Sequence, residues 1–199
     1  MNKRILIAAV KTQRRSIAMG RMIFIIPMFM VLYFFFQDPA RAGRTNLALN
    51  GTATQIDTSD GAEASRAIDG NVDGNFYDGS VTHTASTDHP WWQVDLGKDY
   101  RLGQINVWNR TDCCSERLHD FTMQVLDSYN TVVWQQFYAA FIQNLSEGPG
   151  TSGMSIMLPS GLSGKIVKII NGDDYLHLAE VQVYAPVQLP GGISILLLN

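Results

Sequence analysis

The sequence predicts an all-β fold, an antiparallel β-sandwich of the jelly-roll type. The chain holds seven or eight short segments rich in β-branched and aromatic residues, and Gly-, Asp- and Asn-rich turns separate them. No long segment has the 3.6-residue periodicity of an amphipathic helix. Short strands at this spacing are typical of sandwiches and jelly rolls. The expected strands are residues 52–56, 91–96, 105–108, 121–126, 131–134, 155–158, 165–170 and 179–184.

The segments between the strands are expected to form turns. Asp127-Ser-Tyr-Asn130 has the residue types of a tight turn and joins two strands into a predicted hairpin. Gly97-Lys-Asp99 predicts a turn after the strand at 91–96, and residues 62–68 are expected to form one helical turn. Four tryptophans lie in strands, which favours the core over a ligand platform; they are Trp91, Trp92, Trp108 and Trp134.

Charge is divided unevenly along the 199 residues. Residues 1–45 carry eight Lys and Arg and one acid, a net charge of +7. Residues 46–199 carry seven Lys and Arg and seventeen acids, a net charge of −10. An acidic body without a basic stripe argues against nucleic acid as a partner. It is compatible with a bound divalent cation.

The N-terminus has the features of an export signal. Residues 1–21 hold six basic residues and no acid, residues 22–36 carry no charge, and Ala40-Arg-Ala42 gives a small-residue exit. The apolar run is short for a membrane-spanning helix, which needs about 20 residues. Residues 1–45 are therefore expected to be a signal peptide or, if uncleaved, a signal-anchor in a membrane. Both alternatives place the body outside the cytosol, where disulfides persist. Cleavage would make the protein secreted and extracellular, and retention of the segment would anchor it in a membrane.

One cluster of chemistry-bearing residues follows a predicted strand. The run Asn109-Arg-Thr-Asp-Cys-Cys-Ser-Glu-Arg-Leu118 places two arginines around two adjacent cysteines. The planar N–H forks of Arg110 and Arg117 match ligands rich in acceptors. Asp112 and Glu116 are placed to hold those forks. Binding groups often lie where a strand runs out into a loop, so this run is the first candidate site.

Cys113 and Cys114 are the only cysteines of the chain. They bond to each other, stay free, or pair between chains. The Cα atoms of neighbouring residues lie about 3.8 Å apart, whereas ordinary disulfides prefer roughly 4.4–6.8 Å. Spacing alone therefore favours two free thiols, while an extracellular compartment favours a bond.

A second motif consists of oxygen-bearing residues. Asp69-Gly-Asn-Val-Asp-Gly74 matches the opening of an EF-hand calcium loop. Its twelfth position is Ser80 rather than Glu, and two long amphipathic helices are missing from its flanks. The segment is therefore either an ordinary Asp/Asn/Gly turn or a calcium loop of another kind, since its oxygen ligands are of the right type.

A wider pattern links the arginine run to a distant histidine. His83, 26 intervening residues and then Arg-x-Asp-Cys-Cys-x-x-Arg, from Arg110 to Arg117, form its most specific element. The other landmarks are Ala67-Ile-Asp-Gly-Asn71, Gly79-Ser-Val-Thr-His-Thr84, Pro90-Trp-Trp-Gln-Val-Asp-Leu96 and Leu178-Ala-Glu-Val-Gln-Val-Tyr184. In these elements, residues 46–184 resemble the F-type lectins, the fucolectin family. The expected domain is therefore 46–185, with 186–199 as a C-terminal tail of no assigned role.

The resemblance implies a galactose-binding-like, discoidin-like jelly roll that binds terminal L-fucose. It implies that His83, Arg110 and Arg117 hydrogen-bond the sugar through its axial hydroxyl, a neighbouring hydroxyl and the ring oxygen. It also implies that Cys113 and Cys114 form a disulfide packed on an apolar sugar edge. The chemistry is consistent, because donor-only arginines match the lone pairs of a neutral sugar. Fucosylated glycans or free L-fucose are the expected ligands.

The resemblance further implies a structural calcium ion (Ca²⁺). Its ligands would be the side chains of Asp69, Asn71, Ser80 and Glu180, with main-chain oxygens around Arg66 and Ala179. Family domains often occur in tandem or as trimers. This chain has one copy of the motif, and a homo-oligomer is left open.

Two other classes of function compete with a lectin. A discoidin-like module that binds lipid or protein through apolar loop tips is disfavoured by the complete set of His83, Arg110 and Arg117. A glycosidase needs two carboxylates about 5–9.5 Å apart. Asp112 and Glu116 are close in sequence but are better explained as supports for the arginines. We therefore expect a binding protein without catalysis.

Overall fold

The computed structural model describes residues 44–172 and 174–187. The chain divides into two units, Met1–Pro39 and Ala40–Asn199, and all described residues belong to the second. The expected export signal up to residue 43 and the tail from residue 188 lie outside the described residues. Within the described ranges, no helix is long and apolar enough to cross a membrane.

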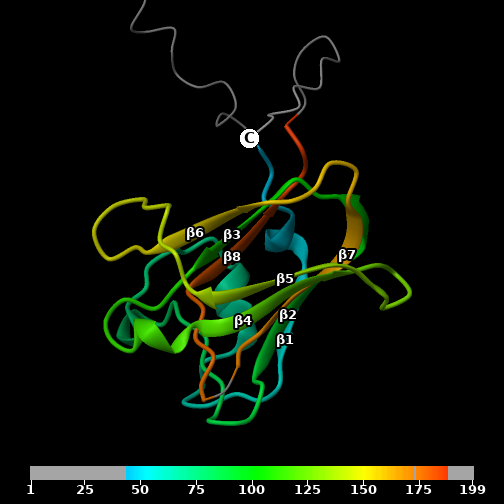
Figure 1. The fold of residues 1–199 in the computed structure, drawn as a ribbon. Helices are drawn as coiled ribbons and strands as arrows, with labels where there is room; N and C mark the ends of the chain where they lie inside the picture. Colours follow the sequence, from blue (N-terminus) through cyan, green and yellow to red (C-terminus); the bar gives the residue numbers. More distant parts are fainter. Residues whose placement is uncertain (1–43, 173, 188–199) are drawn as a thin grey trace, which may run out of the picture. The chain divides into compact units, whose positions relative to one another are not determined.

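Two antiparallel sheets form the described domain (Figure 1). One sheet has the strand order β1-β2-β7-β4-β5 and the other the order β6-β3-β8. Every strand pairing is antiparallel, as the prediction of an antiparallel sandwich requires. The strands are β1 (Thr52–Gln55), β2 (Trp91–Arg101), β3 (Gln104–Trp108), β4 (His119–Leu126), β5 (Val132–Ala140), β6 (Gly153–Met157), β7 (Ser163–Ile170) and β8 (Glu180–Tyr184). Short 3-10 helices lie between them: η1 (Leu47–Asn50), η2 (Ala64–Ile68), η3 (Phe76–Asp78) and η4 (Ser115–Arg117).

The predicted strands are all present, and the helical turn expected at 62–68 corresponds to η2. The turn predicted at 97–99 is wrong. β2 continues through these residues, with Gly97 at a φ of 88° and a register shift between Asp95 and Tyr100 in the pairing with β7. Pairing with β7 on both sides of this irregularity keeps the strand continuous, so the glycine serves a bulge rather than a turn. The predicted hairpin of β4 and β5 is confirmed, although β5 runs further than expected, to Ala140.

The core lies between the sheets. Phe121, Met123 and Val125 are alternate residues of β4 and are fully buried, which is the period of a strand with one covered face. Trp92 and Trp108 are also fully buried, which confirms the core placement for these two tryptophans. The other two strand tryptophans are half-buried.

The first described residues are tied to the last strand. Asn46 forms an isolated β-bridge with Tyr184, and its side-chain oxygen accepts a hydrogen bond of 2.9 Å from the main-chain N–H of Val183. The guanidinium of Arg44 lies 4.9 Å from the ring centroid of Tyr184 and donates to the main-chain oxygen of Ala185 at 2.6 Å. The two ends of the domain therefore lie side by side (Figure 1).

Candidate functional site

Three chain segments meet at one end of the sandwich. His83 precedes β2, Arg110 and Arg117 lie between β3 and β4, and the segment from 171 to 179 connects β7 to β8. The antiparallel register places the end of β3 opposite the start of β8, and the start of β2 opposite the end of β7. The fold therefore brings together residues that are far apart in the sequence.

Two aromatic side chains link His83 to both arginines. The ring centroids of His83 and Phe76 are 5.6 Å apart, and the guanidinium carbon of Arg110 lies 4.5 Å from the same Phe76 centroid. On the other side, the rings of His83 and Tyr175 are 5.2 Å apart, and the guanidinium carbon of Arg117 lies 4.5 Å from the Tyr175 centroid. We call these five residues the His83 cluster. The three residues picked out by spacing in the sequence are thus brought together.

Asp112 holds Arg110 by a bidentate ion pair. Nε and Nη2 of Arg110 donate to its two carboxylate oxygens at 2.9 Å each, and the main-chain N–H of Phe76 donates to Oδ1 at 3.0 Å. The hydrogen bond from Arg110 is the main cause that lowers the pKa of Asp112 to about 2, against an opposing effect of partial burial. The support predicted from Asp112 is confirmed. The hydrogen bonds described for Arg110 use Nε and Nη2, which leaves Nη1 for a ligand.

Arg117 has a different acidic partner from the one predicted. Its Nε lies 3.5 Å from Oδ2 of Asp174, and its main-chain oxygen accepts a 2.8 Å hydrogen bond from the side chain of Asn171. Glu116 was expected to hold this fork, but the ion pair described for Arg117 is with Asp174. Asp174 is distant in the sequence, and only the connection from β7 to β8 brings it here.

The tautomer of His83 is fixed by a neighbour. The ring is buried, with 7% exposure, and Nδ1 lies 2.6 Å from the main-chain oxygen of Thr84. A carbonyl oxygen only accepts, so Nδ1 carries a proton and Nε2 of the neutral ring is an acceptor. One acceptor nitrogen beside two donor forks suits a ligand whose hydroxyl groups both donate and accept.

A disulfide joins Cys113 to Cys114 in the loop between the two arginines. Cys114 adopts a φ of 59°, which is uncommon for a residue other than glycine. Cys113 is exposed and Cys114 is half-buried. The loop therefore presents a compact, weakly polar group between Arg110 and Arg117 along the chain.

Sequence reasoning gave no role to Tyr175 or His177. The ring of His177 lies 4.2 Å from that of His83 and is 2% exposed, and neither of its nitrogens has a hydrogen-bond partner among the described residues. Burial is the main cause that lowers the pKa of His177 to about 3, and the charges of the two nearby arginines lower it further. The available signal was the alternation of Tyr175 and His177 with Leu176 and Leu178, which are both buried.

Residues 66–169 match the family model of the NedA-like, galactose-binding domain. Fucolectin-6 of Anguilla japonica is 35% identical over 153 residues, which cover 74% of this chain and 79% of the relative. This chain belongs to the fucolectin family of F-type lectins.

Solved structures agree with this membership in the fucolectin family. The lectin domain of Lectinolysin complexed with Lewis B antigen superposes with a TM-score of 0.65 at 32% identity, over 72% of this chain and 98% of that one. A Streptococcus pneumoniae fucose binding module, SpX-3, gives a TM-score of 0.64 at 33% identity, over 72% and 99%. Both confirm the predicted galactose-binding-like fold. These relatives are named as lectins, which agrees with the expectation of a binding protein and disfavours the glycosidase alternative.

In this fucolectin-family domain, Asp69 of the expected calcium residues lies near Glu180, the first residue of β8, and Ala179 directly precedes it. Glu180 is fully buried; its Oε1 accepts from Asn46 at 3.5 Å, and its Oε2 has no hydrogen-bond partner among the described residues. Burial and the charge of Asp69 raise the pKa of Glu180 to about 8, against the opposing effect of the main-chain N–H groups at 69 and 70. A cation would satisfy Oε2 and offset the repulsion between the two carboxylates. The residues therefore fit the expected metal.

The character of the donor atoms favours calcium over a transition metal. The described residues contain no cluster of three or more His, Cys, Asp and Glu side chains that suits a metal. The side chain of Asp69 turns back onto its own loop, where its Oδ1 accepts a 2.8 Å hydrogen bond from the main-chain N–H of Asn71. Oxygen donors of mixed type suit calcium. The expected set is the carboxylates of Asp69 and Glu180, the side-chain oxygens of Asn71 and Ser80, and the main-chain oxygens around Arg66 and Ala179.

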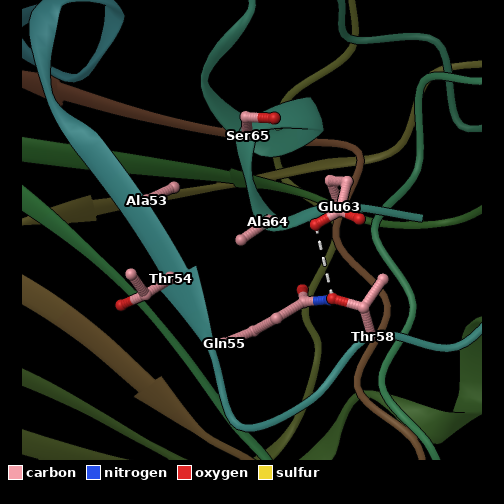
Figure 2. Close-up of a pocket in the computed structure, with 7 residues that line it drawn as sticks. All are labelled: Ala53, Thr54, Gln55, Thr58, Glu63, Ala64 and Ser65. Atoms are coloured by element: carbon pink, nitrogen blue, oxygen red, sulfur yellow. Dashed lines mark hydrogen bonds between the residues drawn. The ribbon is translucent and has the colours of Figure 1, made fainter. Parts of the chain in front are cut away.

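A separate groove of about 320 Å³ lies between β1 and η2 (Figure 2). Gln55, Thr58 and Glu63 point toward one another across it, and the Thr58 hydroxyl donates to Glu63 at 3.5 Å (Figure 2). Gln55 also donates to the main-chain oxygen of His83 at 3.3 Å. The groove has no arginine and no aromatic ring in its lining, so we place the candidate site at the His83 cluster. The lining residues are Ala53, Thr54, Gln55, Thr58, Glu63, Ala64 and Ser65.

Proposed function

We propose that this domain binds terminal L-fucose on glycans, or free L-fucose, at the His83 cluster. The observation that carries the proposal is the packing of His83 and both arginines around Phe76 and Tyr175. Such packing orders the polar groups before a ligand arrives, which lowers the entropy cost of binding. The fucose binding module and the Lewis B complex among the relatives support this ligand class.

Each residue has a distinct part in this proposal. Arg110 and Arg117 donate to sugar oxygens, and Nε2 of His83 accepts from a sugar hydroxyl. Asp112 and Asp174 balance the two guanidinium charges, so donor geometry selects a neutral ligand and anions gain little. The disulfide of Cys113 and Cys114 gives an apolar contact for a sugar edge.

We also propose a structural calcium ion at Glu180 and Asp69, with Asn71, Ser80 and the main chain at 66 and 179. When bound, the ion supplies positive charge to a buried carboxylate. The loop that it would hold continues into η3, whose Phe76 belongs to the His83 cluster. Calcium therefore acts on sugar binding through the position of Phe76, without touching the sugar.

Export from the cytosol is part of the same proposal. A disulfide in the binding loop requires an oxidising compartment, and residues 1–45 carry the pattern of a signal peptide or signal-anchor. The expected partners are fucosylated glycans rather than nucleic acid, and the membrane is a partner only where the N-terminal segment is retained.

A glycan array, with and without free L-fucose at millimolar concentration, tests the proposed function. We expect the chain to bind fucosylated glycans and free fucose to compete. Arg110→Ala should lose this binding, whereas Arg101→Ala, which changes an exposed residue at the end of β2, should keep it. Binding only to glycans without fucose, or no competition by fucose, would contradict the proposal.

A further inference from the structure

Asn171 is a fully buried polar residue at the point where β7 ends and the connection to β8 begins. Its side-chain nitrogen donates to the main-chain oxygen of Arg117 at 2.8 Å and to that of Tyr175 at 3.2 Å. Both acceptors are carbonyl oxygens, which cannot donate, so the partners fix which way the amide faces. One amide therefore joins the arginine loop to a segment that is 54 residues away along the chain.

The main chain at Asn171 is itself held by the five-stranded sheet. Its N–H donates to the main-chain oxygen of Pro90 at 2.8 Å, directly before β2. The preceding residue, Ile170, pairs with Trp91 of β2 on one side and with Thr122 of β4 on the other. Asn171 is therefore a fixed point of the fold, from which the side chain reaches the binding loop.

The contacts made by the guanidinium of Arg117 are weaker than this main-chain contact. The hydrogen bond from Asn171 is the shortest one described for Arg117. The ion pair with Asp174 spans 3.5 Å, and its two side chains are 30% and 43% exposed, so solvent weakens it. The ring of Tyr175 supports the guanidinium from 4.5 Å, but the main chain of Tyr175 is itself bonded to Asn171. The position of Arg117 therefore depends on Asn171 in two ways.

The two arginines of the His83 cluster thus differ in how they are held. Arg110 is fixed at its guanidinium by the bidentate carboxylate of Asp112, two residues away in the sequence. Arg117 has a single long ion pair at its guanidinium, and its short, buried contact is at the main chain. A buried amide from another segment therefore does for Arg117 what a neighbouring carboxylate does for Arg110.

We propose that Asn171 is a positioning residue of the sugar site: it holds Arg117 and Tyr175 together and thereby sets where the Arg117 fork meets the ligand. The inference rests on the function proposed above. Asn171 is fully buried, so it acts through Arg117 and does not touch the sugar. Without its amide, two carbonyl oxygens lose a donor, and the arginine loop is free to move away from the connection to β8. Ordering a displaced arginine at binding then lowers the affinity.

Titration calorimetry of the whole chain with L-fucose tests this role. Asn171→Ala should lower the affinity about tenfold. Asn171→Leu keeps most of the side-chain volume and removes only the polar group, so a similar loss excludes a cavity as the cause. Asn106→Ala is the matched control, because Asn106 is also buried and its amide donates to Gln182 at 3.0 Å within the three-stranded sheet. The control should change the affinity by no more than about twofold.

Two-dimensional NMR of the arginine Nε–H groups, without sugar, provides a readout that does not depend on the ligand. Both Asn171 variants should shift the resonance of Arg117, which lies over the Tyr175 ring, and leave that of Arg110 in place. Thermal unfolding should show every variant folded at the temperature of measurement.

An unchanged Arg117 resonance in both Asn171 variants would overturn the proposal. An equal loss of fucose affinity in Asn106→Ala would also overturn it, because the loss would then come from removal of any buried amide. If the wild type itself fails to bind L-fucose, the proposed function falls. The Arg117 resonance then still decides whether Asn171 positions this side chain.

Discussion

The His83 cluster and the loop around Glu180 differ in how their charged side chains are paired. In the cluster, Arg110 has Asp112 as a bidentate partner, and Arg117 has Asp174. At Glu180, the carboxylate is fully buried and has one long hydrogen bond from an amide and another carboxylate nearby. The charges of the first region are therefore balanced without a bound ion, whereas a cation would balance those of the second. This difference distinguishes the proposed sugar site from the proposed calcium site.

Calcium should have the largest effect, and it should act on stability. A ligand that binds the native state alone adds about 4 kcal/mol to the free energy of unfolding at 1,000 times its dissociation constant. We expect the melting temperature in calcium to exceed that in chelator by about 10 °C. Glu180→Gln should remove most of this difference. Equal melting temperatures of the wild type in calcium and in chelator would contradict the proposed difference between the His83 cluster and the loop around Glu180.

Arginine geometry should have the next largest effect, and it should act on binding. Arg117→Lys keeps the charge but replaces a planar fork by a point ammonium. A lost hydrogen bond to a charged group costs about 1.5–3 kcal/mol, which is roughly a 10- to 150-fold loss of fucose affinity. Titration calorimetry should therefore show Arg117→Lys to be nearly as weak as Arg117→Ala. Both changes at Arg101 serve as controls, and wild-type affinity in Arg117→Lys would disprove a role for the fork.

His177 should make the domain less stable in mild acid. Its pKa is about 3 in the folded protein and about 6.5 unfolded, so between these values the unfolded chain binds more protons. Its contribution is present above pH 6.5 and is lost as the pH falls toward 3, by about 2 kcal/mol between pH 7 and 5. His177→Gln should reduce this change in the free energy of unfolding between pH 7 and 5, as measured by urea unfolding at each pH. An unchanged profile would show that His177 is not held neutral.

Asp112→Asn should have the smallest effect, because it leaves Arg110 in place and removes only its partner's charge. We expect fucose affinity to fall about 3- to 10-fold. In the wild type, the carboxylate contribution is present above the ordinary pKa of Asp and is lost only as the pH falls toward about 2. Binding at pH 5 should therefore retain the benefit of Asp112. A wild-type affinity in Asp112→Asn would show that Phe76 alone positions Arg110.

The sequence predicted features that depend on neighbours in the chain. The alternation of apolar and polar residues predicted the strands. Asp112, the bidentate ion-pair partner of Arg110, lies only two residues away in the sequence. Long-range contacts were harder to foresee. A turn was expected at Gly97 because the local sequence gives no sign of the pairing with β7 that keeps β2 extended. Asp174 and His177 reach the cluster only through the connection from β7 to β8, so neither had a local signal of comparable strength.

The most direct test of the account is a titration of the isotope-labelled chain with L-fucose, followed by two-dimensional NMR of its amides. The account predicts that the largest shifts fall on His83, on residues 110–117 and on Tyr175. The groove between β1 and η2, residues 53–65, should change little. Shifts centred on that groove, or none at millimolar fucose, would contradict the claim that the His83 cluster is the sugar site.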